Sequence, residues 1–300
     1  MRRLPQIALL SDGKRLHLQD GPIDLIIEAN GQKAAVKAGY EAAASRFTGL
    51  LDELCAELGG LRRAADPGQC RLKGNVARRM HAAVAPFAAD RFITPMAAVA
   101  GSVAEEILGA MVKVAELDRA YVNNGGDIAL HLAQGQHFGI GLIDRPDRLG
   151  VMRTMTIDAD DASRGVATSG RHGRSFSLGI ADAVTVLART ASQADAAATI
   201  IANAVDLPGH PAIVRCPAQD LQPDSDLGER LVTREVGQLS YPDIEAALEA
   251  GAACARALLA KGLIEAAALR LHGETVVVAV EQRRSTRKFL TGAIEQPVHA

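Results

Sequence analysis

The N-terminal part of the chain consists of short runs rich in apolar residues and bounded by turn residues, a pattern typical of strands. Candidate strands run from Gln6 to Leu10, from Arg15 to Gln19 and from Ile23 to Ala29. Turn residues separate or close them at Asp12-Gly13 and at Asn30-Gly31. Strands joined by such short turns pair antiparallel, so the sequence predicts a small antiparallel sheet here.

After Lys33 the spacing of the apolar positions becomes helical. Apolar residues fall at i, i+3, i+4, i+7 and i+11, on one helical face, at Phe47, Leu50, Leu51, Leu54 and Leu58. This pattern predicts one long amphipathic helix that ends at Gly59-Gly60. Two further helices are predicted, from Asn75 to about Asp90 with a kink or an end at Pro86, and from about Met96 to Leu117.

The rest of the chain mixes short strands with helices. Strands are predicted at Arg119 to Asn123, Asp127 to Ala133, His137 to Ile143 and Val184 to Ala188, helices from Ser192 and at Ile244 to Ala260, a long connection at Pro208 to Asp226, and a hairpin at Ala266 to His272 with Glu274 to Val280. Because the elements come in blocks rather than in strict βαβ alternation, the predicted fold class is α+β with antiparallel sheets packed against helices. We expect one unit over residues 1–300, with an N-terminal sheet and helices in 1–90, an α+β core in 91–280 and a solvated tail in 281–300.

Composition and charge narrow the classes of function. The chain has 300 residues, 48% of them hydrophobic, which is enough for one large core or two modest ones. Lys and Arg total 33 against 35 for Asp and Glu, so no general positive field draws in nucleic acid or an anionic membrane. The four cysteines lack metal-ligand spacing and no apolar stretch has membrane-spanning length without a charge. We therefore expect a cytoplasmic protein with reduced thiols and no nucleic-acid or membrane partner.

Asp195 and Thr199 form the strongest chemical signal, because an acid and a hydroxyl one helical turn apart face the same way. Under one interpretation they are structural: Ser192 is the N-cap, Asp195 completes a capping box, and Thr199 bonds back to a backbone carbonyl. Under the other, the two oxygens hold one side of a hard cation such as Mg²⁺, which takes its remaining ligands from phosphates and water. The first arrangement is the commoner in proteins, and spacing alone leaves both open.

Two glycine-containing segments are further candidates. Asn123-Asn124-Gly125-Gly126-Asp127 either makes a simple turn or lets a flat or phosphorylated ligand approach bare backbone. Ala167-Thr168-Ser169-Gly170 either satisfies its own tight turn or cradles phosphate. Of the eight dispersed histidines, His172 lies in a loop rich in Gly and Arg. The chain has no Walker A, HExxH or Gly-x-Ser-x-Gly motif.

Five segments in order resemble the ApbE family of flavin transferases. They are Ala97 to Ala104, Asn123 to Ile128, Phe138 to Gly141, Ala167 to Gly170 and Asp195 to Thr199. The chain resembles the cytosolic branch of the ApbE-like superfamily, and that resemblance extends through Leu231 to Gly237 to nearly the whole length. The resemblance implies the ApbE α+β fold. It also implies a site for FAD with Mg²⁺, cleavage of the FAD pyrophosphate, and transfer of FMN to a Thr or Ser of an acceptor protein.

Carried over by position, the resemblance implies roles for individual residues. Asp195, Thr199 and the backbone carbonyl of Ala98 match the metal site. The flavin-side glycine motif of the family corresponds to Asn124, Gly125, Gly126 and Asp127. The family's conserved turn corresponds to Thr168, Ser169 and Gly170. A metal bridging the pyrophosphate would neutralise charge that builds up on the leaving group.

Two departures from the family pattern affect the expected reaction. Gly101 stands where the family has Lys, which removes a cation near the phosphates. The stretch that supplies the family's catalytic His is replaced by Gly173 to Gly179, so that His172 or Arg174 become the candidates to substitute. The alternatives are a non-catalytic module that binds flavin or nucleotide, and an enzyme acting on another small molecule of cofactor or heterocycle metabolism. The Ala-rich helix faces could also serve a homodimer, or pack internally.

Overall fold

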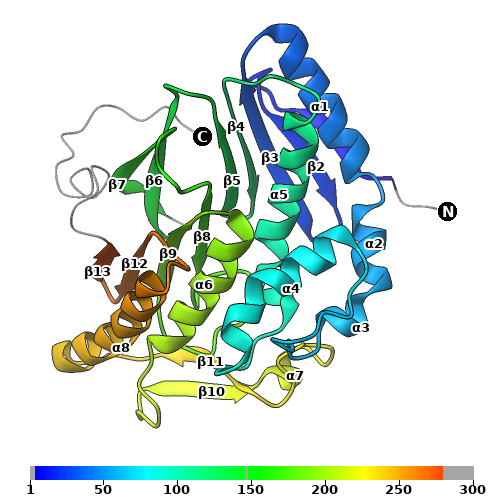
Figure 1. The fold of residues 1–300 in the computed structure, drawn as a ribbon. Helices are drawn as coiled ribbons and strands as arrows, with labels where there is room; N and C mark the ends of the chain where they lie inside the picture. Colours follow the sequence, from blue (N-terminus) through cyan, green and yellow to red (C-terminus); the bar gives the residue numbers. More distant parts are fainter. Residues whose placement is uncertain (1–3, 146–147, 280–300) are drawn as a thin grey trace.

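The computed structural model describes residues 4–145 and 148–279, and its centre is one nine-stranded antiparallel sheet (Figure 1). The order of the strands is β1-β2-β3-β4-β5-β8-β9-β12-β13. Their bounds are β1 Gln6–Leu9, β2 Leu16–Asp20, β3 Ile23–Asn30, β4 Arg119–Asn124, β5 Asp127–Leu132, β8 Gly165–Ser169, β9 Ala183–Ala188, β12 Ala266–Leu271 and β13 Glu274–Ala279. The predicted N-terminal sheet and C-terminal hairpin are confirmed, and the fold class is α+β.

The long helix predicted after Lys33 is wrong, because the chain breaks into three helices. These are α1 Lys33–Phe47, α2 Leu50–Ala56 and α3 Leu58–Leu61. The break falls at Gly49, whose φ of 86° lies in the left-handed region that a helix cannot use. Apolar spacing continues through this break because Phe47, Leu50 and Leu54 all face the same core. The glycine pair Gly59-Gly60 lies inside α3 instead of ending a helix.

The remaining helices follow the sequence more closely. They are α4 Asn75–Ala88, η1 Pro95–Ala98, α5 Val99–Val112, α6 Ala191–Ala204, α7 Ala218–Leu221 and α8 Tyr241–Ala260, η1 being a 3-10 helix. Pro86 lies within the last turn of α4 without ending it. Helix α8 begins with a capping box in which Ser240 accepts from the Asp243 amide and Asp243 accepts from the Ser240 amide. Within the described residues one helical segment, Pro95–Val112, has the length and apolarity of a membrane span, and half of it is buried inside the protein.

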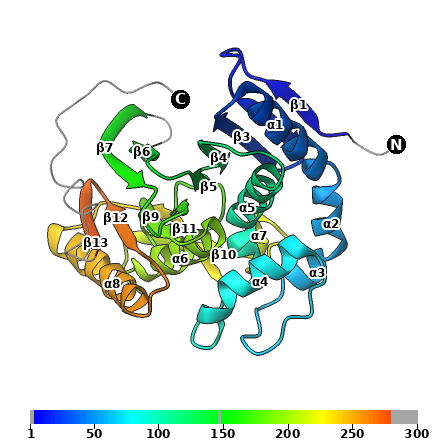
Figure 2. The same cartoon turned by 45° about the horizontal axis from the view of Figure 1, so that its top comes forward.

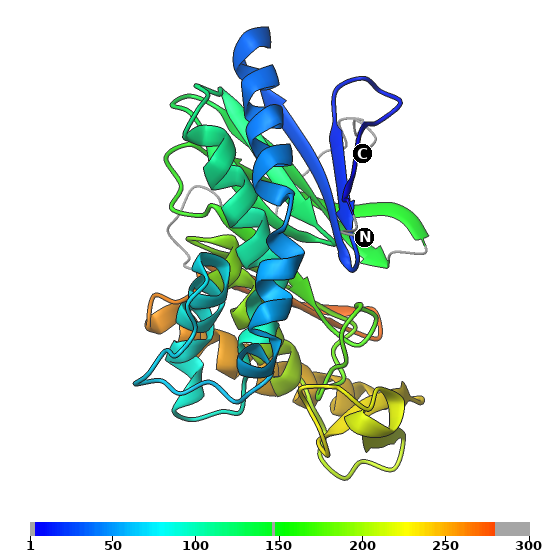
Figure 3. The ribbon, with the colours of Figure 1, turned by 90° about the vertical axis from the view of Figure 1, so that its right-hand side faces the viewer.

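Helices cover one face of the sheet in the order of the strands beneath them. Helices α1 and α5 lie on β2 to β5, α6 lies on β8 and β9, and α8 lies on β12 and β13. The side view shows the helices α1 and α5 on one side of the N-terminal strands (Figure 3). On the opposite face lies a hairpin of β6 His137–Arg145 and β7 Arg148–Asp158 (Figure 2). A smaller apolar cluster lies between this hairpin and the middle of the sheet.

The long connection predicted at Pro208 to Asp226 is wrong, because it contains regular structure. Strand β10, Ile213–Pro217, pairs with β11, Leu231–Val236, and α7 follows β10 directly. This two-stranded sheet is held to the rest of the molecule by backbone, since the amide of Thr233 donates to the carbonyl of Ser177. The sequence shows no alternation in β10 because none of its five residues is fully buried.

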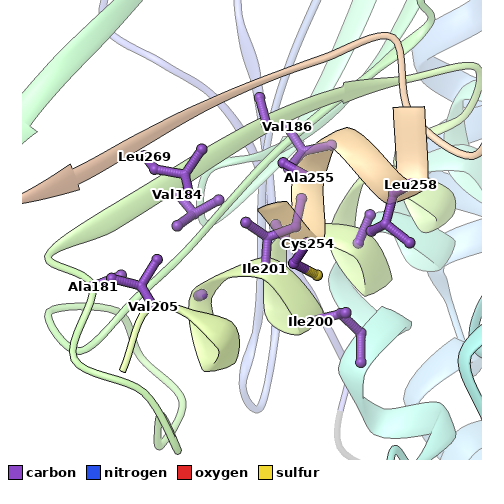
Figure 4. Close-up of a cluster of buried hydrophobic side chains, with 14 of the residues drawn as sticks. Ala181, Val184, Val186, Ile200, Ile201, Val205, Cys254, Ala255, Leu258 and Leu269 are labelled. Carbon is purple, nitrogen blue, oxygen red and sulfur yellow. The ribbon is translucent and has the colours of Figure 1, made fainter. Parts of the chain in front are cut away.

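The helix layer contains two main apolar clusters. One lies under α1, α4 and α5 and includes Phe47, Met80 and Ile107, while the other lies around α6 and α8. In the second cluster, side chains of α6 and α8 meet those of β9 and β12, as with Ile201, Leu258 and Val186 (Figure 4). Helix α6 is buried on nearly all sides, which explains its small residues Ala191, Ala194 and Ala196 to Ala198.

The two clusters meet where α5 crosses the start of α6. A Cβ on Gly101 would lie closer than 3.0 Å to the backbone of Ala191 and Ser192, and a Cβ on Gly165 would lie equally close to Thr190 and Ala191. The N-terminal end of α6 is therefore in backbone contact with both α5 and β8. Small residues at these points are a requirement of close approach.

We expect Gly101→Ala to destabilise the protein by about 1–3 kcal/mol, because the added methyl group overpacks two helix backbones. Urea denaturation monitored by circular dichroism measures this. Gly109→Ala is the matched control on the same helix, because a Cβ there meets open space. Removing a helical glycine should stabilise that variant by about 0.5–1 kcal/mol. Equal effects at the two positions would contradict the packing explanation.

Candidate functional site

Strand parity places two polar residues of the β4–β5 hairpin under the helices. Asn124 and Asp127 are directly opposite one another in the antiparallel pairing, so they share one face. That face is the helix-covered one, because Ala129 packs in the core below α5. The side-chain amide of Asn124 is buried and donates to the carbonyl of Ala100 at 3.2 Å. The hairpin end is thereby attached to the first turn of α5.

Asp127 stands at the start of β5, on the face of the sheet that α5 and α6 cover. Its Oδ1 accepts from the backbone amide of Thr168 at 3.2 Å, which links β5 to the end of β8. Asp127 is partly buried. Asp127 thus has one oxygen bonded at the end of β8 and lies close enough to Asp195 on α6 to feel its charge.

Asp195 has a different structural role from the capping box that the sequence suggests. The N-cap of α6 is Thr190, whose hydroxyl accepts from the amide of Gln193, and Ser192 lies within the first turn. Instead, Oδ2 of Asp195 accepts from the amide of Gly101 at 2.9 Å. The carboxylate therefore caps the neighbouring helix α5, where unpaired amides and the positive end of the helix dipole favour an anion.

The two carboxyl groups are close enough to raise the cost of ionising both. Burial and the negative charge of Asp195 raise the pKa of Asp127 well above its usual value, against the opposing hydrogen bond from the Thr168 amide. Burial raises the pKa of Asp195 to about 7, although the amides of Gly101 and Ala100 act in the other direction. A pair of carboxylates enclosed in this way favours a bound proton or a cation between them.

Thr199 and Ala98, the other two residues expected to hold a metal, offer oxygens of the kind that a hard divalent cation takes. Thr199 lies one turn after Asp195, is partly exposed, and its hydroxyl has no hydrogen bond within the described residues. Ala98 is buried between η1 and α5, in a conformation that is neither helical nor extended, and η1 packs against α6. The described residues contain no cluster of three or more His, Cys, Asp or Glu, so such a cation would need ligand and water oxygens as well.

The Gly125-Gly126 turn requires two glycines for its backbone. Their φ values are 66° and 109°, and Oδ1 of Asn123 accepts from the amide of Gly126 at 2.8 Å. A Cβ on Gly126 would meet nothing within 4 Å, so bare backbone is open to a ligand there. The turn borders Asp127, which brings this surface next to the carboxyl pair.

The segment from Ala167 to Gly170 is the end of strand β8 and not the tight turn that the sequence suggests. Strand parity turns the side chain of Thr168 to the face opposite α6, where its hydroxyl bonds that of Thr185 at 2.9 Å. Its amide, not its hydroxyl, reaches the carboxyl pair. Ser169 has the parity of Ala167, which is buried under α6, and so belongs to the same face as Asp127.

His172 and Arg174 follow β8 in one loop but have different neighbours. Nε2 of His172 lies 3.3 Å from Oδ1 of Asp182, an atom that Nη2 of Arg171 also approaches at 2.6 Å. The guanidinium of Arg174 instead lies against Gly125 and donates to the carbonyl of Pro22 at 3.3 Å. Of the two, Arg174 reaches the glycine turn.

Sequence reasoning missed Asp182 and Glu105. Asp182 also accepts from the amide of His272, a residue with φ of 47°, and so organises the loop that carries His172. Glu105 accepts from the amide of Ser192 at 2.6 Å and is paired with Arg79 at 3.2 Å. An acid in the apolar run Ile180 to Val186 was the available signal for Asp182, whereas Glu105 looks like an ordinary helical acid.

Comparisons with known proteins agree with this architecture. A family model described as AbpE bacteria matches residues 7–277. The chain has the fold of the flavinyl transferase ApbE of Pseudomonas stutzeri, in a crystal structure of the apo form, with a TM-score of 0.52 over 97% of this chain and 99% of the other at 11% identity. At that identity the likeness concerns the fold alone.

Curated relatives belong to a group called UPF0280 proteins. The protein of Methanococcoides burtonii is 38% identical over 130 residues, which cover 40% of this chain and 49% of the relative. That of Methanosarcina acetivorans is 41% identical over 117 residues, 38% of this chain and 44% of the relative. The chain thus spans about half the length of these relatives. Because the family model matches most of the sequence, the chain belongs to the AbpE bacteria family.

We expect Asp127→Asn to make the protein more stable than the wild type at pH 8, by about 1 kcal/mol or more, since one pKa unit corresponds to about 1.4 kcal/mol. Asp127 and Asp195 each have a pKa in the folded protein above the usual 3.8, so folding favours their protonated forms. The free energy of unfolding therefore falls as the pH rises through the folded-state pKa values. The advantage of the variant should therefore shrink toward pH 4. Urea denaturation at pH 4, 6 and 8 measures it.

The exposed Asp160 provides the control for this pH dependence. Asp160→Asn should leave the unfolding free energy unchanged at every pH, because the acid is solvated in both states. If the Asp127→Asn variant is less stable than the wild type at pH 8, the two carboxyl groups do not repel each other in the folded protein.

Proposed function

We propose that this member of the AbpE bacteria family binds a flavin nucleotide, FAD or FMN, together with Mg²⁺. The observation that carries the proposal is the enclosed pair Asp127 and Asp195 beside the unpartnered hydroxyl of Thr199. In the absence of a cation, this arrangement costs folding free energy at neutral pH. A bound cation that pairs with the two carboxylates would offset this cost.

In this proposal Asp195, Thr199 and the carbonyl of Ala98 hold the metal on the helix side. Asp195 is already oriented by the amide of Gly101, and the second oxygen of its carboxylate is the one available to a cation. Asp127 lies across from it at the start of β5. The bound Mg²⁺ would neutralise negative charge on the ligand's phosphates.

The flavin side of the proposed site is the surface of the β4–β5 and β8 ends. The Gly125-Gly126 turn gives a flat ring system access to backbone, and Asn124 anchors the turn to α5. Thr168, Ser169 and Gly170 supply backbone at the end of the adjoining strand. Gly170, with a φ of 152°, lies close to the carbonyl of Asp182 and keeps this strand end next to the loop of His172.

FMN transfer to a Thr or Ser of an acceptor protein is the reaction that we propose for this site. The phosphoanhydride bond of FAD would break, a phosphoester would form between FMN and the acceptor hydroxyl, and AMP would leave. The hydroxyl proton needs an acceptor, and His172, held beside Asp182, is the candidate. The Pseudomonas stutzeri protein that shares this fold is a flavinyl transferase, which supports this proposal.

A specific observation favours a second candidate function, ligand binding without turnover. Gly101 cannot be exchanged for a lysine without moving α5 from α6, because a Cβ would already collide with the backbone of Ala191. The cation that the family resemblance places here is therefore excluded by packing, and a protein without it could retain the nucleotide unchanged. An enzyme acting on another small molecule would use the same surface but would not be stabilised by flavins. The proposed location is the cytoplasm. A homodimer is a prediction.

We expect the protein to bind FAD in the presence of Mg²⁺ and to lose most of that affinity in EDTA. Thr199→Val should weaken the Mg²⁺-dependent part by about tenfold, as expected for a lost ligand contact of about 1.4 kcal/mol. It should not lower stability, because the hydroxyl has no hydrogen bond to lose. Isothermal titration calorimetry and thermal denaturation of each variant separate these effects. Thr48→Val is the control, because its hydroxyl bonds a helix carbonyl distant from the site.

Incubation with FAD, Mg²⁺ and candidate acceptor proteins tests the reaction itself. Transfer predicts an acceptor mass increased by FMN and an equal amount of AMP. Binding of FAD without either product would support the second candidate. A panel of flavins, nucleotides, pterins and aromatic acids in which no flavin raises the melting temperature would overturn the flavin proposal.

A further inference from the structure

Arg174 lies across two turns at the same edge of the main sheet. Nη2 donates to the carbonyl of Pro22 in the β2–β3 turn at 3.3 Å. Nη1 would lie 3.2 Å from a Cβ on Gly125 in the β4–β5 turn, so the guanidinium is in contact with that glycine. The residue itself comes from a third segment, the loop after β8. Three chain segments thus converge on one guanidinium.

The charge of Arg174 is not neutralised by the protein. Among the described residues no carboxylate lies within ion-pair distance of it, and the side chain is exposed. Its neighbour Arg171 is the contrast, with Nε at 2.8 Å and Nη2 at 2.6 Å from Oδ1 of Asp182. A guanidinium offers five N–H donors, and the Pro22 carbonyl uses one of them. Arg174 therefore has both charge and donors available for a ligand.

The guanidinium of Arg174 lies near the same turn as the carboxyl pair Asp127 and Asp195. Gly125, which Arg174 contacts, is a central residue of this short β4–β5 turn, and Asp127 is the first residue after it. An anion on this turn would meet a guanidinium on one side. On its other side it could share a cation with the carboxylates. Because Gly101 has no room for a side chain, α5 cannot supply a positive charge at that position.

We propose that Arg174 forms a phosphoryl-binding subsite on the Gly125-Gly126 turn. The chemical class of ligand is a phosphate monoester or a diphosphate, because a planar guanidinium binds two phosphate oxygens side by side. The identification of that phosphate as part of a flavin nucleotide rests on the proposed function. A free nucleotide would present the same chemistry, and the experiment below distinguishes the two sources.

A purely structural role for Arg174 predicts a different result. In that case the side chain only joins the β2–β3 and β4–β5 turns, and its removal would lower stability and weaken all ligands alike. The exposed hydrogen bond to Pro22 is long, at 3.3 Å, so its loss should change the melting temperature little. Comparing ligands with and without phosphate separates the two roles.

The test uses the full chain and four ligands: FAD, FMN, riboflavin and ADP, each with Mg²⁺. The variants are Arg174→Ala and Arg174→Lys, and the matched control is Arg78→Ala, an exposed arginine on α4 that bonds only its neighbour Asn75. Calorimetry gives the dissociation constants, and thermal denaturation without ligand reports folding. We expect Arg174→Ala to weaken FAD, FMN and ADP about tenfold or more and to leave riboflavin and the melting temperature unchanged. Arg174→Lys should lose less, and Arg78→Ala nothing.

The outcomes separate this inference from the proposed function. Unchanged affinity of Arg174→Ala for every phosphorylated ligand, or an equal loss for riboflavin, would overturn the subsite. If the wild type binds ADP in a manner that depends on Arg174 but binds no flavin, the subsite stands and the flavin proposal fails. If the wild type binds FAD and Arg174→Ala binds it equally well, the flavin proposal stands and the subsite fails.

Discussion

The crossing of α5 and α6 at Gly101 is the constraint on which the rest of the structure depends. Because the backbones of Gly101 and Ala191 touch, both helices lie close to the sheet and to each other, and β8 approaches α6 in the same way at Gly165. This contact brings Asp195 to the unpaired amides at the start of α5. Glu105, held by Arg79, caps the start of α6 in return. Each helix is thus capped by an acid from the other, which fixes their relative position more firmly than apolar packing alone.

The same crossing determines the chemistry of the candidate site. It excludes a side chain at position 101 and leaves α5 without a cation there, while it encloses Asp195 beside Asp127. Two carboxyl groups that share little water are unfavourable for stability and favourable for binding cations, as is common where a site is built at the expense of the fold. Positive charge then has to come from a separate segment, and the loop after β8 provides it through Arg174.

The sequence was a good guide to elements and a poor guide to their ends. Period-two alternation located β2, β3 and β4, because each of these strands has one buried face, whereas all four residues of β1 are exposed. The helix after Lys33 was extended too far, since apolar spacing continues through a break that only the φ of Gly49 reveals. The sequence does not predict strands β10 and β11, because few of their side chains are buried. Asp195 was recognised as a capping residue, but the helix that it caps lies elsewhere in the chain.

The sequence by itself determined the α+β class, the glycines of the β4–β5 turn and the choice of Asp127, Asp195 and Thr199 as candidates. These follow from local rules, namely side-chain period, turn chemistry and the facing of residues one helical turn apart. Tertiary structure alone decided that Asp127 and Asp195 share one enclosed space and that Thr168 offers its amide and not its hydroxyl. It also decided that Arg174, and not His172, reaches the glycine turn. Such pairings depend on strand order and helix crossing, which bring together residues far apart in the chain and which no local pattern encodes.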